Sequence, residues 1–293
     1  MNWMKYKLLY FAISLTMIVI SIYGLSTWGL KLGVDFTGGS VLEVKISGDV
    51  STEDVKKVLN ESEFDLTSVL ISGDDGFIVK TPPLDAGEKN KIVEALNQSY
   101  DEVVELRYEI VGPAIGPELV KKTIYAIAIA AGAILLWIAY QFKSIKYGAS
   151  AILAMFHDSF ILLGSFALLG HFYGAEVDFL FVTALLTTLS FSVHDTIVVF
   201  DRIREINKRG GGDLVDVTNR ALTETMVRSL NNSFTIIFML VALLLLGGST
   251  IKWFAVALLI GTILGTYSSP FVATPLLVTF DNMGKKIRER MKK

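Results

Sequence analysis

The sequence contains no cysteine and only three histidines. Without cysteine the chain can form no disulfide framework, no thiolate metal site and no catalytic cysteine, and three histidines leave little material for a zinc site. No stretch fits the phosphate-binding pattern G-x-x-x-x-G-K-[ST], so no nucleotide-binding loop is visible. We therefore expect no cofactor and no metal, and any work that the chain performs must draw on a membrane gradient or on a partner.

Charge is also scarce and unevenly distributed. Charged residues make up 19% of the chain and hydrophobic residues 52%, with a mean hydropathy of +0.52, whereas soluble domains are about 25% charged and about 45–50% apolar. The apolar residues form blocks, and roughly 20 apolar residues suffice for a helix to cross a bilayer. The blocks lie at residues 8–28, 124–142, 149–169, 179–200, 234–246 and 253–280. The sequence therefore predicts an α-helical membrane protein with six transmembrane helices.

Three of these blocks raise a question of boundaries. The first follows a basic start, as a signal peptide would, but it is longer than the usual signal segment of about 7–15 residues and no clear cleavage site follows it. We therefore predict a retained helix. The fifth block is short unless residues 229–233 join it. The sixth is long enough to continue past the membrane or to break near Pro270 and Pro275.

Lysine and arginine cluster in the segments that a six-helix topology places on one side of the membrane. These segments are the N-terminus, the second-to-third connection, the fourth-to-fifth connection and the tail at residues 285–293. Basic residues near helix ends mark the cytoplasmic side. We therefore predict a multi-pass protein of the cytoplasmic (inner) membrane, with both termini cytoplasmic and residues 29–122 extracytoplasmic.

The segment at residues 29–122 carries most of the acidic side chains and has the pattern of a small α+β domain. Strand patterns occupy residues 41–46, 66–71, 77–80 and 103–111, and helix patterns occupy residues 53–60 and 89–98. Thr52 is the predicted cap of the first helix. The order β-α-β-β-α-β is that of a ferredoxin-like unit, and the glycine pair Gly38-Gly39 predicts a tight turn at its entrance, beside Asp35.

The chain therefore divides into four parts. Residues 1–28 form the cytoplasmic N-terminus and the first helix, 29–122 the extracytoplasmic domain, 123–280 a five-helix membrane bundle, and 281–293 a basic cytoplasmic tail. The run from Gly112 to Pro117 is expected to form a rigid joint between the domain and the second helix, because proline and glycine alternate in it.

Five motifs occur in order along this topology. They are Gly33-Val-Asp-Phe-Thr-Gly-Gly39 after the first helix, Val111-Gly-Pro-Ala-Ile-Gly116 before the second, Phe156-His-Asp158 in the third, His194-Asp-Thr-Ile-Val-Val-Phe-Asp-Arg-Ile-Arg-Glu205 closing the fourth and Gly261-Thr-Ile-Leu-Gly-Thr-Tyr-Ser-Ser269 in the sixth. Together they resemble, from end to end, the SecF family of membrane subunits of the Sec protein-export machinery. One departure is Arg228-Ser-Leu-Asn-Asn-Ser-Phe-Thr235, where the family has a stretch of the form R-T-x-x-T-S.

The resemblance implies a fold related to the RND family of proton-driven exporters, in the form of an RND-like half bundle. It also implies a partner, SecD, with the same six-helix plan and a larger external domain, and the length suits a separate subunit rather than a fused SecD–SecF chain. The implied role is that of a non-enzymatic accessory subunit that, with SecD, uses protons to promote export of polypeptides through the SecYEG channel and its associated factors. Nucleic acid is not an expected partner.

Asp195 is the main candidate for chemistry. An ionisable group inside a spanning segment costs roughly 2.5–3.5 kcal/mol on insertion scales, so it normally has a task or a partner. Thr188, Ser192 and Asp195 are spaced i, i+4, i+7 and therefore share one helical face. This polar path to a carboxylate suits a hydrated route for protons, and the resemblance also implies a proton-relay aspartate here.

Two further residues are candidates for the same relay. Arg228 begins the fifth span and could pair with Asp195 if its helix begins upstream, but it could equally be a positive anchor at the cytoplasmic surface. Asp158 lies in the middle of the third helix and could hydrogen-bond within the bundle. Its neighbour His157 cannot fully share its face, because adjacent helical residues point about 100° apart. His194, which is next to Asp195, is assigned to packing or hydrogen bonding.

Small residues repeat at every fourth position of the sixth helix, at Ala257, Gly261, Gly265 and Ser269. This spacing permits close packing of helices, so we expect this face to contact another helix, either within the chain or in SecD.

Three alternatives remain open from the sequence. The chain could be an RND-type exporter of small molecules or lipids, or a passive subunit that stabilises the translocon and moves no protons. An intramembrane protease would require Asp158 and Asp195 to align as an acid pair.

Overall fold

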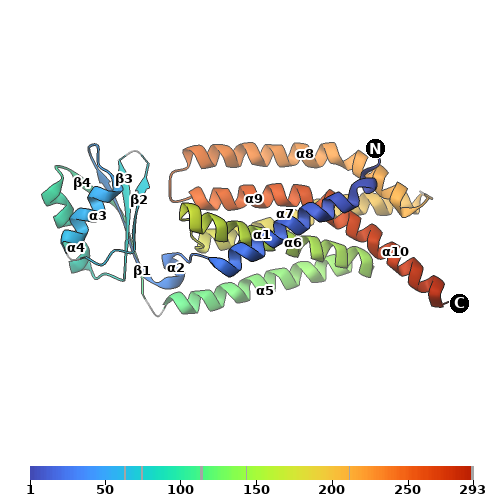
Figure 1. Cartoon of the computed structure of the whole chain (residues 1–293), viewed down its shortest axis with the longest axis horizontal. Coiled ribbons are helices and arrows are strands. Elements are labelled where there is room, and N and C mark those ends of the chain that lie inside the picture. Colours follow the sequence, from blue (N-terminus) through green and yellow to red (C-terminus); the bar gives the residue numbers. More distant parts are fainter. Residues whose placement is uncertain (63, 74, 113–114, 143, 211, 292–293) are drawn as a thin grey trace.

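The computed structural model describes residues 1–62, 64–73, 75–112, 115–142, 144–210 and 212–291. Two residues of the predicted joint, Pro113 and Ala114, one basic residue of the second-to-third connection, Lys143, and the last two of the tail lie outside the described residues. The described chain consists of a long helical bundle with a small α/β unit at one end, and both ends of the chain lie toward the other end (Figure 1).

Six helical segments among the described residues are long and apolar enough to cross a membrane, which confirms the six predicted spans. They are α1 (Lys7–Thr27, preceded by the short helix η1, Trp3–Tyr6), α5 (Ile115–Phe142), α6 (Ile145–Tyr173), α7 (Phe179–Lys208), α8 (Leu214–Leu246) and the continuous segment of α9 (Lys252–Ser268), η2 (Ser269–Ala273) and α10 (Thr274–Met291). Most run well beyond the apolar blocks, because helices continue into polar sequence where capping and packing support them.

The structure shows where the fifth span begins and whether the sixth span breaks at its prolines. Helix α8 begins at Leu214, where the Asp213 carboxylate accepts a hydrogen bond from the amide of Val215, so residues 229–233 belong to it. The sixth segment does not break at its prolines. It passes through one turn of π-helix, η2, which includes Pro270, and such a turn accommodates a residue that lacks an amide hydrogen.

The α/β domain is the unit formed by β1 (Gly39–Ile46), α3 (Thr52–Glu61), β2 (Ser68–Ser72), β3 (Gly76–Thr81), α4 (Ala86–Ser99) and β4 (Val103–Val111). Its strands form one antiparallel sheet in the order β2-β3-β1-β4. The predicted element order is confirmed, and all four predicted strands agree with the structure to within two residues at each end. Strand β2, for example, starts two residues later and ends one residue later than the pattern indicated.

The cap of α3 is Ser51, so the prediction of Thr52 is wrong by one residue. The backbone of Ser51 is extended, its hydroxyl accepts from the amide of Asp54, and the Asp54 carboxylate accepts from the amide of Ser51. This reciprocal pair is a capping box. Both hydroxyl residues could cap a helix, and the residue three positions on decides between them: Ser51 has Asp54, whereas Thr52 has Val55.

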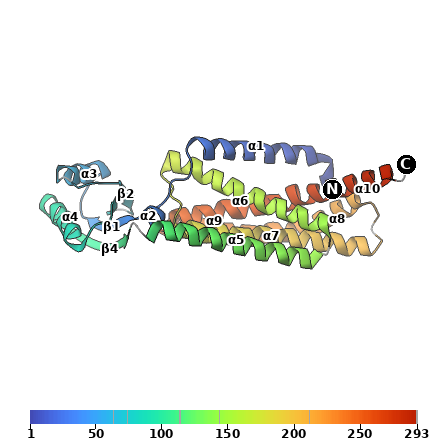
Figure 2. The ribbon, with the colours of Figure 1, turned by 90° about the horizontal axis from the view of Figure 1, so that it is seen from below.

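The two faces of the sheet have different partners. Side chains such as Leu42, Val44 and Val79 are buried on one face, where α3 and α4 cover the sheet. The other face is turned toward the bundle, as Figures 1 and 2 show from two directions. Between this face and the bundle lies a cavity of about 300 Å³, lined from the sheet by Glu43 and Lys80 among others.

The short helix α2 (Val34–Thr37) joins α1 to β1. The glycine pair after it has positive φ angles, 76° at Gly38 and 144° at Gly39, a region that only glycine enters without strain. The turn predicted at the entrance of the domain is therefore present.

Candidate functional site

Helix α7 lies in the centre of the bundle and carries the predicted polar path. Thr188, Ser192 and Asp195 are all buried, with at most 6% of each residue exposed. Their common face packs against α9 and α8, so three polar groups at helical spacing point into the protein. The three do not form one chain of hydrogen bonds: Thr188 donates to the carbonyl of Leu185 on its own helix, and the other two contact different neighbours.

Asp195 accepts a hydrogen bond of 2.7 Å from the hydroxyl of Ser229 on α8. Arg228, the residue before Ser229, has an exposed side chain. It lines a shallow cleft of about 570 Å³ together with three acidic residues, Asp201, Glu205 and Glu224. In the structure, the neutral hydroxyl of Ser229 therefore bonds to the Asp195 carboxylate. The Arg228 guanidinium lies in the neighbouring cleft, toward the end of the bundle that is remote from the α/β domain.

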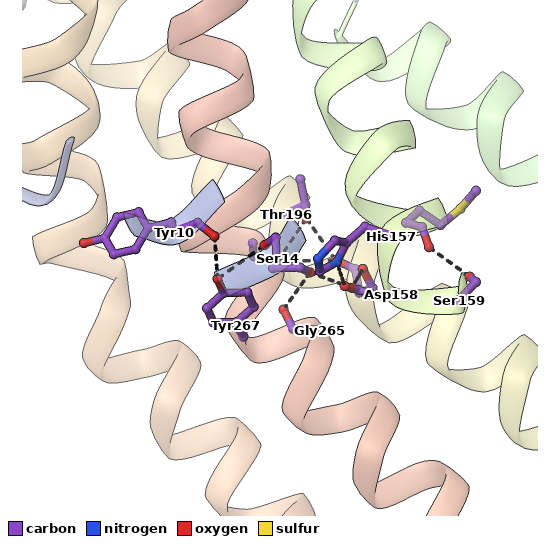
Figure 3. Close-up of polar contacts among 12 residues, drawn as sticks. Tyr10, Ser14, His157, Asp158, Ser159, Thr196, Gly265 and Tyr267 are labelled. Atoms are coloured by element: carbon purple, nitrogen blue, oxygen red, sulfur yellow. Dashed lines mark hydrogen bonds and ion pairs between the residues drawn. The ribbon is translucent and has the colours of Figure 1, made fainter. Parts of the chain in front are cut away.

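Asp158 lies at the centre of a second buried polar cluster. Its Oδ2 accepts hydrogen bonds from the hydroxyls of Ser192 at 2.6 Å and Ser268 at 2.5 Å, and its Oδ1 lies 2.8 Å from Nδ1 of His157. These four residues come from α6, α7 and α9, so the carboxylate holds three helices together. Figure 3 shows His157 and Asp158 side by side within this cluster.

The cluster continues toward α1. The ring of Tyr267 stacks on that of His157 at 6.5 Å between centroids. Its hydroxyl lies 3.3 Å from that of Ser14 and donates to the carbonyl of Tyr10 (Figure 3). Nε2 of His157 is buried and has no hydrogen-bond partner among the described residues. His157 thus brings a polar atom into the interior of the cluster that the described residues leave unused.

The two buried carboxylates occupy separate environments. Asp158 accepts from Ser192 and Ser268 and Asp195 accepts from Ser229, and within the described part of the chain no hydrogen bond joins one carboxylate to the other. An aspartic protease requires two carboxylates that share a proton. Among the described residues, Asp158 and Asp195 do not form such a pair.

The small residues of the sixth span face α7. A Cβ atom on Gly261 would lie 1.9 Å from Cγ2 of Thr188, and one on Gly265 would lie 3.2 Å from Cα of Ser192. Ala257 is fully buried, and the hydroxyl of Ser269 lies 2.9 Å from that of Thr196. The spacing allowed contact with a helix of this chain or with one in SecD. In the structure, this face packs against α7 of the same chain.

Sequence reasoning missed three members of these clusters. Ser229 and Ser268 stand in segments rich in hydroxyl residues, where the sequence does not distinguish the one that reaches a carboxylate from another helix. The sequence pattern places His157 and Asp158 on different faces because adjacent helical residues diverge, yet the imidazole bends back to the neighbouring carboxylate. The signal that could have found it is adjacency itself: two polar residues in the middle of an apolar helix satisfy each other more readily than they find separate partners.

His194, the neighbour of Asp195, is exposed on the bundle surface, where it lines a shallow depression with Trp137 and Ser190. Among the residues that the structure describes, no group of three histidine or acidic residues is arranged to hold a metal ion. What the arrangement offers chemically is two buried carboxylates, each bonded to hydroxyls, in helices long enough to span a membrane.

Comparison with known proteins places the chain among protein-export subunits. Residues 91–283 match the family described as "Protein export membrane protein SecD/SecF, C-terminal", and residues 23–50 match "SecD/SecF GG Motif". The chain is 41% identical to the protein translocase subunit SecF of Thermobaculum terrenum, over 95% of this chain and 93% of that one. It is 36% identical to SecF of Anaerolinea thermophila, over 96% and 94% of the two chains.

Among solved structures, SecDF from Thermus thermophilus, a translocon-associated membrane protein, superposes with a TM-score of 0.86 at 32% identity. The match covers 96% of this chain but only 39% of that one, so a large part of the solved SecDF chain lies outside the match. The predicted resemblance, carried by the five motifs, is confirmed by these matches. The chain belongs to the SecD/SecF family of protein export membrane proteins, and within that family it groups with the SecF subunits.

Proposed function

We propose that this chain, together with SecD, uses the proton gradient to promote export of polypeptides across the cytoplasmic membrane through the SecYEG channel. Its family gives it an accessory role in Sec-dependent protein export. Because the sequence contains no nucleotide-binding loop, the energy for such a role would come from the membrane. Moving one charge through 100 mV is worth about 2.3 kcal/mol.

The observation that carries this proposal is the environment of Asp195. It is buried in the middle of a spanning helix, it is bonded to the Ser229 hydroxyl, and the cleft containing Arg228 opens beside the same pair of helices. A buried carboxylate in a membrane is costly unless it serves a function. Proton uptake and release at Asp195, with Arg228 approaching or leaving, would give two states of the α7–α8 contact, and Asp158 would serve as a second carboxylate on the route.

The orientation follows from charge. We place both termini in the cytoplasm and residues 29–122 outside it, because the basic connections and the basic tail gather at the bundle end opposite the α/β domain (Figure 1). Basic residues at one set of helix ends mark the cytoplasmic side. The α/β domain would then stand where an emerging polypeptide could be received.

The partner contact is proposed at α8. This helix is long and apolar, yet Asn231, Asn232 and Thr235 are exposed on it in the same stretch as Arg228. Polar side chains inside a bilayer normally face protein rather than lipid. The solved SecDF chain has a large part beyond the match, and a SecD subunit equivalent to that part would cover this polar face.

A photoreactive amino acid at Asn232 is therefore expected to form an adduct with SecD when both subunits are expressed in a membrane. The matched control is the same amino acid at Leu15, which is exposed on α1. SecD-containing adducts detected by immunoblotting should be strong at position 232 and weak at position 15. Equal yields at the two positions would show that the polar face does not select the partner.

The proposed function is tested by secretion in cells depleted of this chain. We expect wild type to restore the secretion rate of a Sec-dependent protein, and Asp195→Asn, which keeps the size and one acceptor of the side chain but cannot ionise, to leave it at the depleted level. Pulse-labelled precursor and mature protein give the rate, at membrane levels shown to be equal for the two forms.

Each outcome decides between the candidates. Full rescue by Asp195→Asn would remove the proton role and leave a passive stabilising subunit. Secretion that is unaffected by depletion would contradict the export role itself and favour an exporter of small molecules or lipids.

A further inference from the structure

The end of α7 nearest the α/β domain is capped by two carboxylates. Asp178, the residue before the helix, accepts from the amide of Phe181 at 2.7 Å. Asp35, on α2 and 144 positions away in sequence, accepts from the amide of Phe179 at 2.9 Å. The first amides of a helix have no partner within the helix and carry its positive dipole end, so carboxylates bind there favourably. The segment that leads into the α/β domain thus binds directly to the helix that carries Asp195.

The two caps lie close enough to influence one another. Burial raises the pKa of the Asp178 carboxyl above its usual range, and the negative charge of Asp35 raises it further, whereas the hydrogen bond from Phe181 acts in the opposite direction. Neighbouring carboxylates disfavour each other's charged form, and a partner that both bind offsets this repulsion. Here that partner is the first turn of α7.

A second contact joins the same two parts. Lys80 on β3 forms an ion pair with Glu176, in the loop just before α7, and Lys31 contacts the other oxygen of that carboxylate at 3.3 Å. The side chains of Lys80 and Glu176 are only 14% and 12% exposed. A pair this shielded is screened less by salt than a surface pair, so it ties the sheet to the loop.

The connecting backbone is tight. The amide of Gly33 donates to the carbonyl of Val177 and the amide of Val177 donates to that of Lys31, both at 2.8 Å. A Cβ atom on Gly39, where β1 begins, would lie 2.7 Å from the carbonyl oxygen of Thr81 on β3. The contacts therefore form a closed ring that runs from the start of α7 through α2 and the sheet and back through Lys80 to the loop before α7.

We propose that Asp35 and Lys80 are positioning residues that transmit movement of α7 to the α/β domain, through the amide of Phe179 and the carboxylate of Glu176. The inference rests on the proposed proton role of Asp195, which lies 16 positions along the same helix, or about 24 Å at 1.5 Å per residue. A helix moves as a rigid rod, so a displacement at Asp195 reaches its first turn. The domain has another contact with the bundle, from Ser72 to Ser249, but that contact leads to the turn between α8 and α9.

Because the chain has no cysteine, maleimide labelling of a single introduced cysteine measures the accessibility of that position alone. Ile71, at the mouth of the cavity between the sheet and the bundle, is 58% exposed. In spheroplasts that contain SecD, the rate at which a membrane-impermeant maleimide labels Ile71→Cys is measured with the proton gradient present and after a protonophore collapses it. Gln98→Cys, exposed on α4 away from the cavity, is the control position.

We expect collapse of the gradient to change the labelling rate at position 71 and not at position 98. The change should disappear in Asp35→Ala/Lys80→Met, which removes both contacts. It should persist in Asp35→Asn/Lys80→Arg, because asparagine still caps a helix and arginine keeps the charge. Equal membrane levels and co-purification with SecD exclude a simple loss of folding.

The outcomes separate this inference from the proposed function. If the labelling rate at position 71 still depends on the gradient in Asp35→Ala/Lys80→Met, the coupling role of Asp35 and Lys80 is overturned and the proton role of Asp195 stands. A change that survives in Asp195→Asn overturns the proton role. No change in the Ile71→Cys chain itself overturns the coupling role, and the secretion assay then judges the function alone.

Discussion

The variant Gly261→Ala is expected to leave very little folded protein in the membrane. A Cβ atom at this position would lie 1.9 Å from Cγ2 and 2.6 Å from Cβ of Thr188. Because the clash includes Cβ of the buried Thr188, which no change of rotamer moves, α7 and α9 must move apart. Overpacking of a well-packed interface typically costs about 1–3 kcal/mol. Membrane abundance and the melting temperature of the detergent-solubilised protein measure the effect.

Two further variants make that result specific. Gly132→Ala, in the middle of α5, adds the same methyl group where no atom lies within 4 Å, and it should be neutral or slightly stabilising because alanine favours helix. Thr188→Ser removes the methyl group that Gly261→Ala would strike, so the double variant should recover part of the lost stability. A Gly261→Ala protein as stable as Gly132→Ala would show that the two helices have room to spare.

The six spans could be predicted from the sequence because two independent signals agree. Blocks without charge locate the spans, and the basic connections alternate with them in a way that fits one count. Helix ends could not be predicted from hydropathy. Helix α8 starts 20 residues before its apolar block, at Leu214, because its first turns are held by a cap at Asp213 and by packing rather than by apolar composition.

The candidate site could be predicted in part. Asp158 and Asp195 stand out because a charge within an apolar helix is rare, and both are buried. Their partners could not be identified, because the hydrogen bonds to Asp158 and Asp195 come from hydroxyls on other helices and depend on how those helices are rotated. The cap at Asp35 was likewise invisible, since it depends on a contact between segments 144 positions apart.

This division has a physical origin. A helical face is set by local spacing and can be derived from sequence alone, whereas a contact between helices requires the crossing geometry that packing decides. Thr188, Ser192 and Asp195 therefore do share a buried face. The hydroxyl of Ser192, however, donates to Asp158 on α6, a contact that the spacing along α7 does not reveal.

The last prediction concerns Asp158, where we expect a clear difference between two substitutions. Asp158→Leu removes the acceptor of Ser192 and Ser268 and the partner of His157, all of them buried. Each buried donor left without a partner costs about 1–3 kcal/mol, so this variant should fold poorly. Asp158→Asn keeps the shape and one oxygen acceptor, so most of the protein should remain folded. Membrane abundance and thermal stability measure this difference.

The asparagine variant then separates the structural role of Asp158 from its proposed part in the proton route. If Asp158 takes up protons, Asp158→Asn should reduce secretion in depleted cells even at wild-type abundance, as expected for Asp195→Asn. Normal secretion by the folded Asp158→Asn protein would assign Asp158 to holding α6, α7 and α9 together and leave Asp195 as the sole carboxylate of the relay. The same comparison in Ser268→Ala, which removes one donor and leaves the carboxylate in place, should lower stability slightly and leave secretion unchanged.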